Sequence, residues 1–334
     1  MGVLVQPAAL LLIIVAGYLL KRVGVFGPRD YRVVQAAEFD LVLPGAIIYS
    51  FATNPHHLSL LLVSAFGLFA AMIPPLCVYA ATRHTPVARR AFLMLNVSGF
   101  NLGSFSFPML QALIGPGAIV TAAMLDVGNT TMVAAGTVVM TQSLLRMQPG
   151  VSLPDQHPGP ESKLPKARLD DPDARRLHRR SMIRGVLKGF FGSPSFDVYL
   201  LMVAFMLAQV SLPAWVAQIS KPFSGANAFC SMLMVGMLME LPGSKQDFKD
   251  VCQVLAWRLP FGIAFAVIAW CFLPLDPLVR QAVALCCLSP TAIFATMYTD
   301  KVLDNARLAG FTLALTAVVS TFMMVAAHLL LAGI

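Results

Sequence analysis

Two short polar stretches lie inside long apolar sequence, and their residue types are those that interrupt helices. Residues 99–108 read Gly-Phe-Asn-Leu-Gly-Ser-Phe-Ser-Phe-Pro, and residues 289–291 read Ser-Pro-Thr. Proline removes a backbone donor, and glycine permits unusual dihedral angles. A broken helix exposes a positive N-terminal end, which suits an anion, and free carbonyl groups, which suit a cation. We therefore predict two interrupted helices that form a binding site; the alternative is tight packing in kinked helices.

Asp126 is the other group with chemistry, because it is the acidic residue that we place deep within an apolar stretch. An ionisable group inside a membrane is costly, so it is a functional candidate by default. Its carboxyl group could exchange protons or, when ionised, ligate Na⁺, and the sequence leaves both ions open. Asn129 lies one turn later on the same helix face and is predicted to share this ion-coupling site. The alternative is a structural hydrogen bond to a neighbouring helix.

The elements that must position these groups are membrane-spanning helices. Of the 334 residues, 57% are hydrophobic and 12% are charged, whereas soluble proteins contain about 25% charged residues. Apolar stretches have about the length that a membrane-spanning helix needs, roughly 20 residues. We predict an all-α polytopic membrane protein with ten transmembrane helices, of which the fourth and ninth are broken. The predicted spans are 5–20, 36–53, 58–80, 90–113, 117–145, 195–211, 215–239, 252–274, 279–299 and 308–332.

The basic residues alternate between connections and so predict the orientation of the chain. The net charge of +8 does not indicate nucleic-acid binding, because the basic residues lie in short connections between apolar stretches. Of the 24 Lys and Arg, only Lys221 and Arg280 fall outside alternate connections. The positive-inside rule places the basic connections in the cytoplasm. We therefore expect both termini on the extracytoplasmic side of the cell's inner or plasma membrane.

A long connection divides the predicted helices into five and five. Residues 1–145 form the first five-helix repeat, 146–192 a cytoplasmic basic loop, and 193–334 the second repeat. Since five is odd, two such repeats would have inverted orientation in the membrane. Within the loop, the Pro-rich residues 149–172 are predicted to be disordered, and the basic and apolar residues of 175–190 predict an interfacial helix on anionic lipid.

Three other charged residues are expected at membrane interfaces. They are Arg258, Glu38 and Asp40, which stand near the starts of apolar stretches, where the interfacial interpretation is favoured.

Several function classes are excluded by the absence of their motifs. The sequence has no Walker loop, no metal-ligand cluster and no nucleophile motif. We therefore predict that the protein is not an enzyme, needs no cofactor and does not use ATP.

The motifs of this chain, taken in order, resemble the auxin efflux carrier family. This family includes plant PIN-type auxin transporters and bacterial organic-anion carriers, and it is related to the bile acid/auxin transporter superfamily. The similarity spans nearly the whole chain except the central loop. The matching stretches are 7–22, 39–51, 101–108 with Gly115, Asp126 with Asn129, 193–194, 258–259 and 290–298. Two positions differ from the usual pattern: Ser106 replaces a common glycine, and residues 226–229 lack an expected proline.

The resemblance implies inverted repeats whose broken fourth and ninth helices cross at Pro108 and Pro290. It also implies an elevator-like mechanism, a carboxylate substrate and a homodimer in the lipid membrane. The predicted substrate-binding residues fall into three sets. One side of the crossover is formed by Asn101, Gly103, Ser104 and Pro108, and the other by Pro290, Thr291 and Ala292. Two further residues, Tyr298 and Pro44, are predicted to line the pocket.

The predicted function is secondary active transport of a small organic anion. The alternatives are a membrane sensor or scaffold that binds ligand without turnover, and a passive channel. No charged ring or filter-like repeat in the sequence favours the channel.

Overall fold

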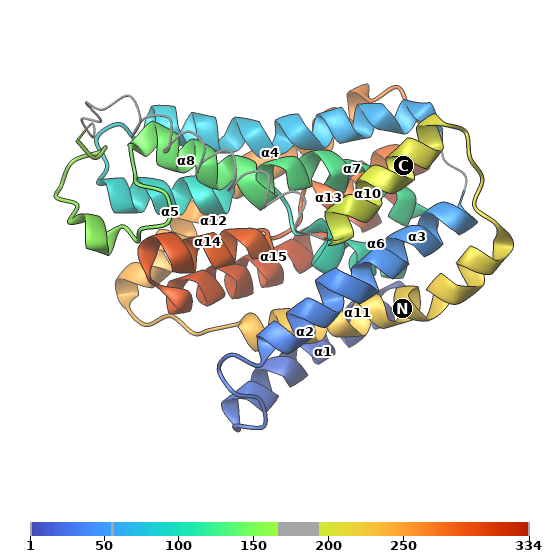
Figure 1. The fold of residues 1–334 in the computed structure, drawn as a ribbon, viewed down its shortest axis with the longest axis horizontal. Helices are drawn as coiled ribbons and strands as arrows, with labels where there is room; N and C mark the ends of the chain where they lie inside the picture. Colours follow the sequence, from blue (N-terminus) through green and yellow to red (C-terminus); the bar gives the residue numbers. More distant parts are fainter. Residues whose placement is uncertain (1, 55–56, 166–193, 333–334) are drawn as a thin grey trace, which may run out of the picture.

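The computed structural model describes residues 2–54, 57–165 and 194–332, and these residues form helices and no strand (Figure 1). The predicted all-α class is therefore confirmed. The helices of the first half are α1 (Gly2–Arg22), α2 (Tyr31–Ala37), α3 (Leu43–Thr53), α4 (Leu61–Ala81), α5 (Val87–Val97), α6 (Phe107–Leu113), α7 (Ala118–Thr131) and α8 (Thr137–Leu145). Those of the second half are α10 (Pro194–Leu207), α11 (Ala214–Leu238), α12 (Lys245–Phe272), α13 (Pro277–Cys286), α14 (Ile293–Leu303) and α15 (Ala306–Ala332).

Short helical segments of other types join or precede some of these helices. Three π-helical segments connect α2 to α3, precede α6 and connect α7 to α8; they are Glu38–Val42, Leu102–Ser106 and Met132–Gly136. Two 3₁₀ turns are Leu58–Leu60 and Pro154–Gln156.

Six helical stretches within the described residues are long and apolar enough to cross a membrane. They are Val5–Arg22, Tyr31–Thr53, Leu58–Ala81, Ala118–Leu145, Lys245–Phe272 and Ala306–Leu331. Some predicted boundaries are wrong because helices extend into polar sequence. α12 begins at Lys245, not at 252, since Ser244 and Asp247 form a capping box in which the Ser244 hydroxyl accepts from the Asp247 amide at 3.1 Å.

The helices pack in two groups, and two further helices lie between them (Figure 1). The first group contains α1, α2, α3 and α11, and the second contains α4, α5, α7, α8, α12, α13, α14 and α15. The short α6 packs against α1 and α7, while α10 packs against α3 and α7. These two helices therefore link the two groups in addition to the direct contacts that α11 makes with α15 and α3 with α7.

Glycine lets helices approach closely within each group. A Cβ atom on Gly236 of α11 would lie 2.1 Å from the Ile14 carbonyl oxygen of α1. In the second group, a Cβ atom on Gly128 of α7 would lie 1.8 Å from the Ser64 carbonyl oxygen of α4. Small residues of this kind allow backbones to touch where lipid supplies no hydrophobic driving force.

The first part of the central loop is docked on the second group. The Leu153 amide donates to the Val302 carbonyl at 2.7 Å, and the Val87 amide donates to the Glu161 carbonyl at 2.9 Å. Leu153 and Leu164 are buried in a cluster with residues of α5, α12 and α14. The prediction of disorder is therefore wrong for residues 149–165, because a few apolar side chains anchor a Pro-rich segment. The predicted interfacial helix at 175–190 lies outside the described residues.

Glu38 is another correction to the sequence analysis. Its side chain is completely buried, and the Ser231 hydroxyl of α11 donates to its carboxylate. The expectation of an interfacial Glu38 is therefore wrong, whereas Asp40, two residues later, is exposed. Glu38 begins a π-helical segment, and it is the packing of α11 against this segment that covers the carboxylate.

Candidate functional site

The first interrupted helix breaks between α5 and the π-helical segment that leads into α6. Residues 98–101 are not helical, and Gly99 adopts a φ of +63°. This conformation favours glycine, and a Cβ atom there would also lie 2.0 Å from Val133 Cγ1. Pro108 is not at the break, because it occupies the first turn of α6, where proline is tolerated.

The second interruption separates α13 from α14, and the two interruptions meet. The backbone N–H of Asn101 donates to the Pro290 carbonyl at 3.1 Å, and the Thr291 hydroxyl donates to the Asn96 carbonyl at 3.2 Å. The hydroxyl groups of Ser106 and Ser289 also form a hydrogen bond. Thus Ser106, which departs from the family's usual glycine, joins the two interrupted helices.

Arg258 of α12 binds both interruptions with one guanidinium group. Its Nη1 donates to the carbonyls of Asn96, Val97 and Gly99 at 3.0, 3.3 and 2.9 Å. Its Nη2 donates to the carbonyls of Ser289 and Pro290 at 2.9 and 3.0 Å. Arg258 is buried, so the expectation of an interfacial arginine is wrong. The carbonyls that we expected to suit a cation are bound by this guanidinium, which compensates the cost of burying both.

Asp126 of α7 is held by three side chains and is linked to the first interruption. Its Oδ1 accepts from Asn129 Nδ2 at 2.8 Å and from the Thr130 hydroxyl at 3.1 Å. Its Oδ2 accepts from the Tyr199 hydroxyl of α10 at 2.7 Å. Asn129 also binds the backbone of Phe100, accepting from its amide and donating to its carbonyl, both at 2.9 Å. One amide side chain therefore connects the carboxylate to the broken helix.

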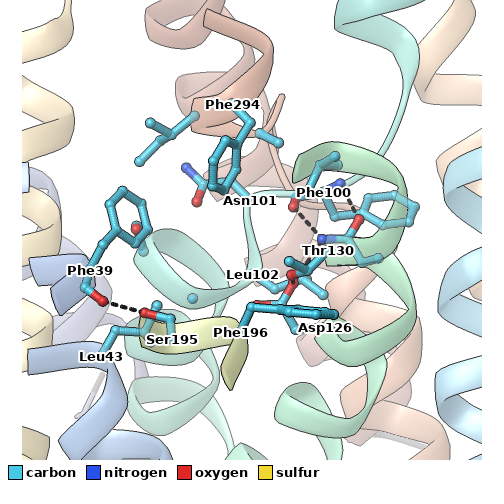
Figure 2. A pocket seen from close by; sticks show the side chains of 16 residues that line it. Phe39, Leu43, Phe100, Asn101, Leu102, Asp126, Thr130, Ser195, Phe196 and Phe294 are labelled. Carbon is cyan, nitrogen blue, oxygen red and sulfur yellow. Dashed lines mark hydrogen bonds between the residues drawn. The ribbon is translucent and has the colours of Figure 1, made fainter. Parts of the chain in front are cut away.

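A cavity of about 40 Å³ lies between these groups (Figure 2). Figure 2 shows Phe39 and Ser195 on one side of the cavity and Asp126 and Thr130 on the other. The lining includes six predicted site residues: Asn101, Gly103, Ser104, Asp126, Asn129 and Ala292. Asn101 Nδ2 and Ser104 Oγ are buried and have no hydrogen-bond partner among the described residues. The cavity thus contains polar atoms available to a ligand.

The other predicted site residues do not line this cavity. Pro108 lies in the first turn of α6, and Pro290 and Thr291 hold the two interruptions together. Pro44 is buried in α3, next to Leu43, which does line the cavity. The Tyr298 hydroxyl donates to the Ala134 carbonyl, so this side chain joins α14 to a π-helical segment.

Sequence reasoning missed the aromatic and π-helical parts of the site. Phe39, Phe196 and Phe294 line the cavity, and Tyr199 binds Asp126. Each of the three π-helical segments contributes at least one lining residue. Such segments are frequent at functional sites, but the sequence shows no signal for them. An aromatic residue in an apolar stretch is equally ordinary.

A cavity that contains buried polar groups and forms where two apolar helices are interrupted is typical of integral membrane proteins that transport solutes. The comparison with known families agrees: the model of the family described as Membrane transport protein matches residues 3–326. The chain belongs to this family, which is the auxin efflux carrier family that the motifs resemble, and that prediction is confirmed. The family is one of transporters, which fits the prediction that the chain is not an enzyme. No curated protein matches the chain.

Proposed function

We propose that the protein is a secondary active transporter of a small organic anion, with a carboxylate as the recognised group. One observation carries the proposal: two interrupted helices meet beside a buried carboxylate, in a cavity between the two helix groups. Non-helical backbone at membrane depth is tolerated where it lines such a cavity.

The anion would bind at the N-terminal end of α14 and at Asn101. Ala292, Ile293 and Phe294 bring the start of this helix to the cavity, and its N-terminal end carries partial positive charge. Asn101 Nδ2 supplies a buried donor with no hydrogen-bond partner in the described part of the chain. The negative C-terminal ends of α5 and α13 would not repel the anion, since Arg258 binds the last carbonyl of α5 and carbonyls that follow both helices. The short α6 does not contribute a comparable end, because the Ser106 amide ahead of it donates to the Asn101 carbonyl.

Asp126 would couple transport to H⁺ or Na⁺. A proton or cation on this carboxylate changes what Asn129 Nδ2 can bind, and the same nitrogen donates to the Phe100 carbonyl. Occupation of Asp126 therefore alters the backbone next to Asn101, where the anion would bind. This link gives the two ligands a physical means of affecting each other's affinity.

Alternating access would require the two helix groups to move relative to each other. The first group contributes Phe39 and Leu43 to the cavity, while the second contributes Asp126, Asn129 and residues 292–294. A cavity needs roughly 10–15 Å³ of this measure to hold one water, so about 40 Å³ admits little more than a few waters. A carboxylate of several heavy atoms would enter after the groups separate, in an elevator-like movement.

The order of helices supports the proposed inverted repeats. The first half has α1, α2 with α3, α4, the broken α5–α6 pair, and α7 with α8. The second half has α10, α11, α12, the broken α13–α14 pair, and α15. Five positions in each half, with the fourth broken, fit ten spans in repeats 1–145 and 193–334, joined by the loop 146–192. Both termini outside the cytoplasm, and assembly as a homodimer, remain parts of the proposal.

The test is a flux assay in proteoliposomes against monocarboxylates, dicarboxylates, aromatic acids and amino acids, with H⁺ or Na⁺ gradients imposed in turn. We expect gradient-driven uptake of at least one acid, and loss of the gradient dependence in Asp126→Asn. Asp197→Asn, which changes an exposed acidic residue of α10, is the matched control and should behave as the parent. Binding without flux would favour a sensor, and currents far above carrier rates would favour a channel. Unchanged gradient dependence in Asp126→Asn would remove this residue from coupling.

A further inference from the structure

A second cavity, of about 430 Å³, lies away from the central site, between α12, α13 and α15. We call it the α12–α15 groove. Its lining is wholly apolar, and four of the lining residues are alanines, whose short side chains leave the volume. The groove is lined by Ile263, Ala266, Val267, Trp270, Cys271, Ala284, Leu288, Met323, Ala326, Ala327, Leu330 and Leu331. Ile263 and Val267 are about half exposed, at 46% and 52%, so the groove opens on the outer face of the second group.

A cation stands at one end of this groove. Arg280, in the first turn of α13, donates from Nη1 to the Trp270 carbonyl at 3.2 Å. Its guanidinium carbon lies 5.5 Å from the centre of the Trp270 ring, which lines the groove. Ala284, one turn further along α13, also lines it. Arg280 Nε is buried without a hydrogen-bond partner among the described residues, so the guanidinium has unused donor capacity.

The other polar groups at this end suit a membrane interface. Gln281 Nε2 and His328 Nδ1 are 3.4 Å apart, and His328 follows Ala327 of the groove. Trp270 belongs to a residue type enriched where hydrocarbon meets the headgroups. Arg280 is also one of the two basic residues outside the basic connections. An apolar groove that ends at one arginine is complementary to a molecule with an acyl chain and an anionic head.

We propose that the α12–α15 groove binds one acyl chain of a membrane glycerophospholipid whose phosphate group pairs with Arg280. Exposed apolar surface on a membrane protein meets acyl chains, and a groove between helices must be filled to keep its van der Waals contacts. Arginine presents a planar fork of donors that matches phosphate geometry. The proposal does not depend on the transported substrate, and its site shares no residue with the central cavity.

Trp270 provides a probe inside the groove. The chain has three tryptophans, so Trp215→Phe with Trp257→Phe leaves Trp270 as the single fluorophore. We would titrate this protein, in detergent micelles, with phosphatidylglycerol whose acyl chains carry bromine, which quenches nearby indole. We expect saturable quenching, and competition by phosphatidylglycerol without bromine.

Variants of the single-tryptophan protein distinguish specific lipid binding in the α12–α15 groove from contact with annular lipid. Arg280→Gln should require about tenfold more lipid for half-quenching, the scale of one charge-assisted hydrogen bond. Arg280→Lys should retain most of the binding, and Ala266→Leu with Ala327→Leu should weaken it by filling the groove. Lys221→Gln removes the other basic residue outside the basic connections, lies on α11 away from the groove, and should match the parent.

Two results would overturn the proposal. Equal quenching curves for Arg280→Gln, Lys221→Gln and the parent would mean contact with annular lipid only. Unchanged quenching in the groove-filling variant, together with loss of a dimer in size-exclusion chromatography, would assign the groove to a second copy of the chain. Neither result bears on flux through the central cavity, so the transport proposal is tested separately.

Discussion

Asn101 and Arg258 both lie at the interrupted helices, but their hydrogen bonding differs. All the donors of Arg258 described above bind backbone carbonyls, so this side chain holds the two interruptions in place. Asn101 Nδ2 is buried in the cavity lining, and no residue that the structure describes forms a hydrogen bond with it. A buried donor without a partner costs free energy in the folded protein. In the proposed function, the transported anion would supply the missing acceptor.

This difference predicts the behaviour of Asn101→Ala. Removing an unpaired buried amide should leave the melting temperature unchanged or raise it, whereas the apparent KM for the transported acid should rise about tenfold, the scale of one hydrogen bond to a charged group. The melting temperature and the concentration dependence of flux would be measured on the same preparation. Asn129→Ala is the control, because its amide binds Asp126 and Phe100 and its loss should lower the melting temperature. A destabilised Asn101→Ala with unchanged KM would contradict a ligand-binding role.

Sequence alone locates only part of this residue network. The spacing of Asp126 and Asn129 within an apolar stretch predicts a shared site, and the structure brings them together at 2.8 Å. The partners of Arg258 are backbone carbonyls from two distant segments, which have no side-chain signature in a sequence. A charged residue near the start of an apolar stretch is equally consistent with the interface, so its burial follows only from the fold.

At the scale of elements, composition predicts where helices break better than how they break. Gly, Ser and Pro in residues 99–108 predict an interruption, but α5 already ends at Val97, and Pro108 lies in the first turn of the next helix instead of breaking one. A π-helical segment follows the non-helical residues, and its extra residue per turn cannot be deduced from residue types. The docking of the first part of the central loop was not predicted for a related reason. Three apolar residues in or beside this Pro-rich segment suffice to anchor it: Met147, Leu153 and Leu164.

The docking of the first part of the central loop leads to a prediction about its hydrogen exchange. Leu153 is 1% exposed and its amide binds the Val302 carbonyl. Truncating a buried leucine typically costs about 2–5 kcal/mol, so Leu153→Ala should accelerate hydrogen exchange across residues 147–165 by at least about tenfold. Hydrogen exchange read by mass spectrometry, on the protein in nanodiscs, measures this directly. Val151→Ala is the control, because Val151 is exposed and its exchange pattern should match the parent. Rapid exchange of the whole segment in the parent would mean that this part of the loop is not docked.

The arrangement of the whole molecule connects the site to the proposed movement. Apolar stretches and basic connections lead to ten predicted spans, because the membrane sets the length of a span and the placement of basic residues; this number stays a prediction. They do not predict which helices form which group, since small residues such as Gly128 and Gly236 allow close approach without naming a partner. The contact between the groups includes α2 and α14, where Gln35 Nε2 donates to Met297 Sδ at 3.3 Å. The aromatic rings of Phe39 and Phe294, with centres 6.0 Å apart, form the adjacent contact at the cavity.

If the groups move past each other, a covalent link between α2 and α14 should stop transport. All six native cysteines would first be replaced, and Gln35→Cys with Met297→Cys would then be joined by a short reducible thiol cross-linker. Flux of an acid that the proteoliposome assay finds to be transported should fall to background and return after reduction. The control pair is Lys21→Cys with Glu240→Cys, which replace residues that form an ion pair of 2.9 Å in the parent. Lys21 lies at the end of α1 and Glu240 lies two residues after α11, so this cross-link joins parts of the first group only. Cross-linking this control pair should leave flux intact. Full flux in the protein cross-linked between α2 and α14 would rule out relative movement of the groups at this contact, because the cross-link prevents these two helices from moving past each other.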